Sequence, residues 1–138
     1  MRSFLACLFL LNASTAWPQN VAKEPVQVFI MMGQSNMVGL GKVSGREGSL
    51  EHAVKEKKLF PYLVDAQGAW KARDDVRHVR VMVGRGGNMQ IFNDEWLKVG
   101  GRTLGPEYGI GHPLGDALPA TVMLLKSCIG NRSLGWDL

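Results

Sequence analysis

The distribution of apolar and polar positions predicts two buried strands with a long excursion between them. The first apolar run is VQVFIMM, Val26–Met32, which is rich in β-branched residues and is followed by Gly33. The second is Thr121–Leu125. Runs that are apolar at nearly every position are typical of strands covered on both faces in a parallel α/β sheet. We therefore expect both runs in the core of one sheet.

The excursion predicts shorter elements. Glycines at positions 39, 41, 45 and 48 mark a loop after the first strand. Residues 51–59 are compatible with a short helix that Pro61 ends. The segment VDAQGAWKARDDVRHVRVMV predicts two short strands around a turn at residues 65–68, with a broken alternation of valines between positions 76 and 83. GRGGNM at 84–89 predicts another loop.

The segment TLGPEYGIGHPLGDALP predicts a helix before the second strand. Pro106 suits the first helical position, where its missing N–H costs nothing, and Glu107 lies in the first turn, where the helix dipole favours an anion. Ile110, Leu114 and Leu118 form an apolar stripe at four-residue spacing. The order of strand, excursion, helix and strand predicts an α/β fold.

These elements are too few to complete such a fold. Two or three strands and one helix do not cover both faces of a parallel sheet. We therefore expect the chain to be the N-terminal part of a longer domain, with a sheet that exposes an apolar edge and face.

The first residues resemble a secretory signal peptide. Arg2 precedes an apolar run at Phe4–Leu11, and small residues around Ala16 fit a cleavage site. Eight apolar residues are too few to span a bilayer, which takes about 20. We predict a signal peptide at 1–16, a leader at 17–25, a domain at 26–138, secreted or periplasmic localisation and no membrane anchor after cleavage.

Composition narrows the classes of function. Of 138 residues, 46% are hydrophobic and 20% charged, which is an ordinary globular balance, and the net charge of +4 is scattered, without the concentrated basic face of a nucleic-acid-binding protein. His52, His78 and His112 lie far apart without metal-ligand spacing. After signal cleavage Cys128 is alone and is expected to be a small core residue. We predict no metal and no cofactor.

Ser35 is the candidate nucleophile. It follows the first strand within GQSNM, and the carboxyl edge of an α/β sheet is where such folds place ligands. The alternative is a serine that caps the next turn or helix. The lipase pattern G-x-S-x-G and a phosphate-binding loop are both absent. A serine nucleophile also needs a base, usually a histidine oriented by a carboxylate.

Four segments carry a family resemblance. MMGQSNMVG, WKARDDVRHVRV, TLGPEYGIG and LLKSCIGNRSLGW resemble successive segments of the SGNH (GDSL-like) hydrolases, in the branch of sialate O-acetylesterases and acetylxylan esterases. The resemblance runs from about residue 26 to residue 138. It implies an SGNH-hydrolase, flavodoxin-like three-layer sandwich with a parallel sheet, here truncated, and a carbohydrate O-acetylesterase that acts on acetylated sugars without a cofactor.

The resemblance also implies roles for individual residues. Ser35 would be the nucleophile and an oxyanion N–H donor, and Gly130 would supply a second N–H donor, unless it is a simple turn glycine. Losing one such donor typically costs about 10²–10³ in rate. Asn131 has the alternative role of tying down its own turn. The residues that would shape the pocket are Gln34, Asn36, Asn131, Arg132 and Ser133.

The family's later blocks, a side-chain amide donor and Asp-x-x-His, have no match in the sequence. Asp75 and His78 have the right spacing but precede the second block and lie in a strand-like segment, where residues three apart point to opposite faces. We expect the chain alone to lack the base. The alternatives are a non-catalytic carbohydrate-binding module on the same fold and a lipid or aryl esterase.

Overall fold

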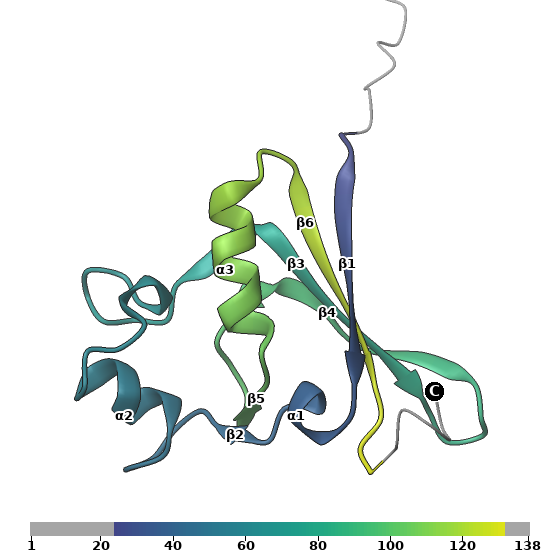
Figure 1. Cartoon of the computed structure of the whole chain (residues 1–138), viewed down its shortest axis with the longest axis horizontal. Coiled ribbons are helices and arrows are strands. Elements are labelled where there is room, and N and C mark those ends of the chain that lie inside the picture. Colours follow the sequence, from purple (N-terminus) through teal and green to yellow (C-terminus); the bar gives the residue numbers. More distant parts are fainter. Residues whose placement is uncertain (1–23, 132–138) are drawn as a thin grey trace, which may run out of the picture.

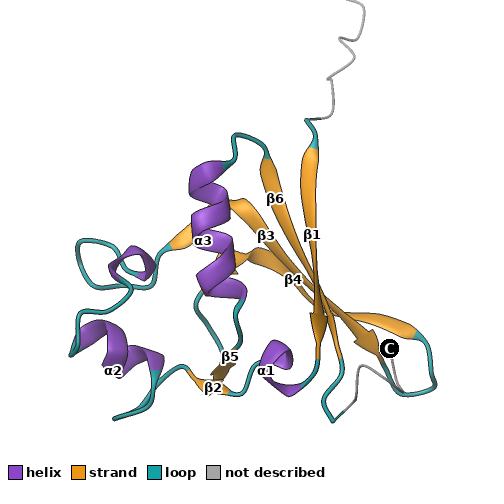
Figure 2. Ribbon diagram, in the orientation of Figure 1, coloured by secondary structure: helices purple, strands orange, loops and turns teal. Residues whose placement is uncertain are grey.

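The computed structural model describes residues 24–131, which form an α/β fold around a four-stranded sheet (Figures 1 and 2). The strands lie in the order β1-β6-β3-β4. Their bounds are Val26–Gly33 for β1, Ala72–Val83 for β3, Met89–Lys98 for β4 and Thr121–Cys128 for β6. The predicted signal peptide, residues 1–16, lies outside the described residues, as does most of the leader.

The sheet is mixed, whereas the sequence predicted a parallel one. β6 pairs in parallel with β1 and β3, but β4 pairs antiparallel with β3. The predicted loop at 84–89 contains the turn between these two strands, and β4 itself was not predicted. Two short strands were predicted around the turn at residues 65–68. The chain has only an isolated bridge across this turn, between Val64 and Trp70, and the single long strand β3 after it.

One face of the sheet carries the core. Val76, Val122 and Leu124 are fully buried there, under the helix α3 (Glu107–Ala117). On the other face, Ile30 and Met32 of β1 are 64% and 58% exposed. The prediction that β1 is covered on both faces is therefore wrong for the described residues. The three-layer sandwich stays a prediction, because the described helices that pack on the sheet cover this one face.

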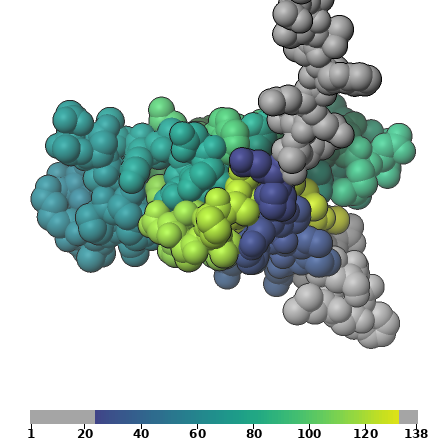
Figure 3. All heavy atoms as spheres, turned by 90° about the horizontal axis from the view of Figure 1, so that it is seen from above, coloured from purple at the N-terminus to yellow at the C-terminus, as the bar shows by residue number. Residues whose placement is uncertain are grey.

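The remaining elements connect the strands. Their bounds are Ser35–Val38 for α1, Gly41–Lys42 for β2, Leu50–Lys55 for α2, Pro61–Leu63 for the 3-10 helix η1 and Thr103–Leu104 for β5. α2 is shorter than predicted and is capped by Ser49, whose Oγ accepts a hydrogen bond from the His52 N–H at 3.1 Å. Seen from above, the segment around α2 and the β3–β4 hairpin lie at opposite ends of the long axis (Figure 3). Within residues 24–131, no helix is long and apolar enough to cross a membrane.

α3 begins one residue later than predicted, because Pro106 occupies the N-cap rather than the first helical position. Its glycines explain its close approach to the sheet. A Cβ on Gly111 would lie 2.4 Å from Leu97 Cδ2 and 3.0 Å from Leu124 Cδ1, whereas a Cβ on Gly109 would meet nothing within 4 Å. The absence of a side chain at position 111 is thus needed for packing.

Substituting Gly111 and Gly109 separately tests this packing. Gly111→Ala is expected to destabilise the fold by about 1–3 kcal/mol, because an added methyl group overpacks the core. Gly109→Ala is the matched control in the same helix and is expected to stabilise by up to about 1 kcal/mol through helix propensity. Urea unfolding measures both changes. Equal effects of the two substitutions would contradict close packing at Gly111.

Candidate active site

Ser35 lies directly beyond the carboxyl end of β1, at the first position of α1. The turn between them depends on Gly33, whose φ of +152° is in a region that favours glycine, and on which a Cβ would lie only 2.9 Å from Met37 Cβ. The α1 turn closes when the Val38 N–H donates to the Gln34 carbonyl at 2.8 Å. The backbone therefore holds Ser35 in a defined position at the sheet edge.

The parallel register of β1 and β6 brings the second candidate loop to the same edge. Gly33 pairs with Cys128, and the Ile129 N–H donates to the Gly33 carbonyl at 3.2 Å. Ser35 and Gly130 therefore each lie two residues beyond paired positions on adjacent strands, which are about 4.8 Å apart in a sheet. In Figure 1 both strands end beside α1.

The backbone donors of this edge are open in the described part of the chain. No hydrogen bond of residues 24–131 engages the N–H of Ser35 or of Gly130. A Cβ on Gly130 would meet none of the described atoms within 4 Å, so this glycine is not required by local packing. Two unused N–H groups at one edge provide the kind of donors that stabilise an oxyanion.

The other predicted pocket residues are placed only in part. Ser35 is half-buried, while Gln34, Asn36 and Asn131 are exposed. Asn131 has φ of +59°, a left-handed conformation that asparagine tolerates better than most residues, as expected if it shapes its own turn. Arg132 and Ser133 lie outside the described residues.

Asp75 and His78 do not form a catalytic pair. The Asp75 carboxylate accepts hydrogen bonds from Arg73 at 2.6 and 2.7 Å, and these bonds are the main cause that lowers its pKa. His78 is buried, and its Nδ1 lies 3.2 Å from Asn93 Nδ2. Burial lowers the pKa of His78, which keeps its imidazole neutral at pH 7.

The other two histidines have no hydrogen bond to Ser35 among the described residues either. His112 is 1% exposed and packs against the Tyr62 ring at 5.4 Å between centroids, so it is a packing residue of α3 rather than a surface residue. His52 is half-buried in α2. Within residues 24–131, no side chain is hydrogen-bonded to Ser35 Oγ.

The sequence interpretation missed a buried ion pair behind the candidate site. Lys126 Nζ lies 2.6 Å from Glu107 Oε2, and both residues are less than 5% exposed. The second carboxylate oxygen accepts the Gly105 N–H at 2.9 Å. A signal for this pair was present, because Lys126 interrupts an apolar run at an inward position of β6.

This ion pair connects β6 to the end of α1. Gly105 packs against Gly39, the C-cap of α1, so closely that a Cβ on Gly39 would lie 2.7 Å from the Gly105 nitrogen. The segment held by Glu107 and Lys126 therefore supports the helix that carries Ser35. Cys128, also on the inward face of β6, is buried, and burial raises the pKa of its thiol.

Comparison with known proteins places this arrangement in a family. Residues 25–134 match the family model described as carbohydrate esterase, sialic acid-specific acetylesterase, which covers both Ser35 and Gly130. The chain belongs to this family. No curated protein and no solved structure matches the chain.

Membership of the acetylesterase family confirms the resemblance identified from GQSNM and the segments after it. It also establishes the carbohydrate esterase class for this domain and implies an SGNH-like fold, with which the α/β sheet agrees.

Proposed function

We propose that the chain supplies the nucleophile and two oxyanion donors for removal of O-acetyl groups from sugars, with O-acetylated sialic acids as the substrate class. The observation that carries this proposal is the register of β1 and β6, which brings Ser35 and Gly130 to one sheet edge with open N–H groups. The match to a sialic acid-specific acetylesterase family supports the choice of substrate.

The reaction would follow a two-step acyl-enzyme route. Ser35 Oγ attacks the acetyl carbonyl while a base takes the hydroxyl proton, and the resulting oxyanion is stabilised by the N–H groups of Ser35 and Gly130. The intermediate collapses, the sugar hydroxyl leaves with that proton, and an acetyl-serine remains. Water, activated by the same base, then releases acetate and restores Ser35. We place the base and its orienting acid outside residues 24–131.

A second candidate is a carbohydrate-binding module on the same fold. It is favoured by one observation, namely that no histidine in the described part of the chain is hydrogen-bonded to Ser35 Oγ. A lipid or aryl esterase is a third candidate, and it differs from the first only in the ester that it accepts.

Acetate release separates these candidates. The protein expressed from its own gene is incubated with O-acetylated sialic acid, acetylated xylose and a long-chain aryl ester, and free acid is measured over time. The proposal expects turnover with the acetylated sialic acid in preference to the other two esters. Binding of the sugar without any turnover would support the binding module, and preference for the long-chain ester would support the third candidate.

A further inference from the structure

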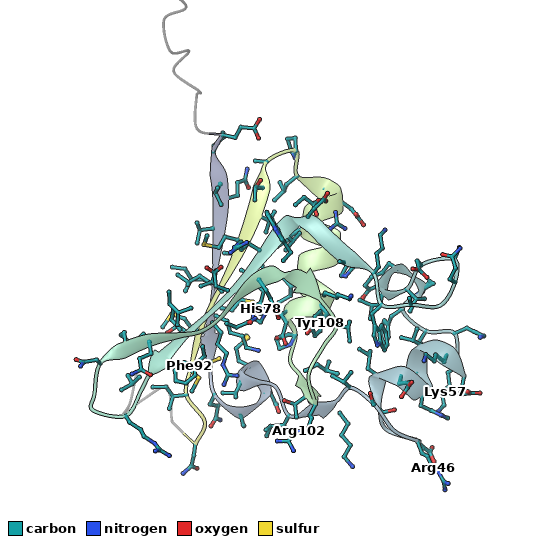
Figure 4. All side chains as sticks on the ribbon, turned by 180° about the vertical axis from the view of Figure 1, so that it is seen from behind. Arg46, Lys57, His78, Phe92, Arg102 and Tyr108 are labelled. Carbon is teal, nitrogen blue, oxygen red and sulfur yellow. The ribbon has the colours of Figure 1, made fainter. Side chains whose placement is uncertain are left out.

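A cavity of about 390 Å³ lies beside the candidate active site, and nothing above assigns it a role. It lies between β3, β4 and the start of α3 and is partly open to solvent, and Val38 of α1 forms part of its wall. Val38 is three residues from Ser35, a helical rise of about 4.5 Å. The volume of the cavity falls within the range of about 300–1,000 Å³ that is usual for small-molecule sites. Figure 4 labels His78, Phe92 and Tyr108, three residues of its lining.

Arg80 lines the cavity, and its guanidinium has only a weak hydrogen-bond acceptor among the described residues. Arg80 is half-buried, and in the described part of the chain its guanidinium donates to the Met82 sulfur, at 3.0 and 3.2 Å. A thioether is a weak acceptor, whereas a guanidinium offers five donors arranged to bind a carboxylate at two points. Among the described residues, no carboxylate lies within ion-pair distance of Arg80.

The rest of the lining leaves positive charge in excess. Three of the lining side chains are cationic and two are carboxylates. One cation and one carboxylate, Lys126 and Glu107, neutralise each other in the buried ion pair. Arg80 and Lys98 then face Glu95 alone. An anionic ligand would balance this charge, whereas a neutral ligand would not.

The lining also provides neutral donors. Asn93 Nδ2 lies 3.1 Å from Glu95 Oε1, to which it donates, and 3.2 Å from His78 Nδ1, which must therefore accept and leave the proton on Nε2. This Nε2–H is buried and has no partner among the described residues. Burial raises the pKa of Tyr108 to about 12, so that its hydroxyl keeps its proton at neutral pH.

We propose that this cavity is a subsite for the carboxylate of an acidic sugar, with Arg80 as the residue that binds it. The inference rests on the proposed function. The subsite would make the proposed esterase selective for sialic acids over neutral acetylated sugars. A sugar whose carboxylate lies on Arg80 would extend along Val38 toward Ser35, so that the charge selects the substrate while the acetyl group lies at the sheet edge.

Binding of N-acetylneuraminic acid and of its methyl ester tests the subsite on the full chain. The ester removes the ligand's charge and leaves the protein unchanged, so it needs no assumption about folding of a variant. The wild-type chain is expected to bind the acid about tenfold or more tightly than the ester, which is typical of a charge-assisted hydrogen-bonded pair. Equal affinities, or no binding of the acid, would overturn the proposal.

Variants then assign the preference to Arg80. Arg80→Gln is expected to abolish the preference for the acid, and Arg80→Lys to keep part of it. Arg46→Gln is the matched control, because Arg46 is exposed in the loop before α2 and far from the cavity (Figure 4), and it should keep the full preference. A preference that survives Arg80→Gln would overturn the assignment, as would equal losses for acid and ester.

Failure of the subsite and failure of the proposed function have different readouts. Sugar binding does not require the nucleophile, so Ser35→Ala should bind the acid like the wild-type chain. Ester hydrolysis without any preference for acidic sugars would overturn only the subsite. A retained preference in a protein that never releases acetate would overturn only the esterase function.

Discussion

Ser35→Ala is expected to lower kcat for acetate release from an O-acetylated sialic acid by about 10⁶-fold, the loss seen when the nucleophile of a serine hydrolase is removed. The reason is chemical rather than structural, because the two-step route needs a covalent acetyl-serine. Ser35 Oγ makes no hydrogen bond within residues 24–131, so its loss should leave the urea unfolding curve unchanged. The measurement is acetate release by the protein expressed from its own gene.

Ser127→Ala is the matched control for this prediction. Ser127 lies near the same edge of the sheet, on β6, but it pairs with Met32 and belongs to the face opposite the core. The same substitution there removes a hydroxyl group without touching the proposed chemistry, and activity should stay close to that of the wild type. Full activity of Ser35→Ala would exclude Ser35 as the nucleophile.

The sequence predicted the position of Ser35 in the fold better than it predicted the sheet around it. GQSNM after an apolar strand placed Ser35 at a carboxyl edge, and the structure has β1 end at Gly33 with Ser35 two residues later. This prediction succeeded because it depended on local signals, namely a β-branched run, a glycine and a polar turn. The nearness of Gly130 depends on the pairing of β1 with β6, which no local pattern encodes.

The residue pattern of β4 shows why this strand was not predicted from the sequence. Its inward positions include Asn93 and Glu95, which line the cavity, and its outward positions include Ile91 and Trp96, which are 67% and 42% exposed. The usual alternation of apolar inside and polar outside is therefore reversed over much of the strand. A cavity lined by polar groups produces this reversal, so the failed prediction marks a feature that matters for function.

The second large expected effect concerns the buried pair of Glu107 with Lys126. Glu107→Gln is expected to destabilise the fold by about 3–5 kcal/mol, because it leaves the ammonium group of Lys126 buried without a countercharge. Glutamine keeps the shape of the side chain and an oxygen that can accept the Gly105 N–H, so this variant isolates the loss of charge. Urea unfolding of the full chain measures the change.

A double replacement and an exposed ion pair serve as controls. Replacing Glu107 and Lys126 together by apolar residues of similar volume is expected to cost much less than Glu107→Gln, because neither charge then remains unpaired. Glu51→Gln breaks the exposed pair with Lys55, at 2.9 Å on α2, and should leave the unfolding midpoint unchanged. If Glu107→Gln shifted the midpoint no more than Glu51→Gln, the ion pair would not be important for stability.

The same variants show whether the ion pair acts on the catalytic edge. Glu107 and Lys126 hold Gly105, and Gly105 packs against Gly39 at the end of the helix that begins with Ser35. Loosening this contact should displace Ser35 relative to Gly130, whose loop follows β6. We therefore expect Glu107→Gln to lower kcat more than it raises KM at temperatures where the protein is still folded. The apolar double variant, if it restores stability but not kcat, would separate support of the nucleophile from support of the fold.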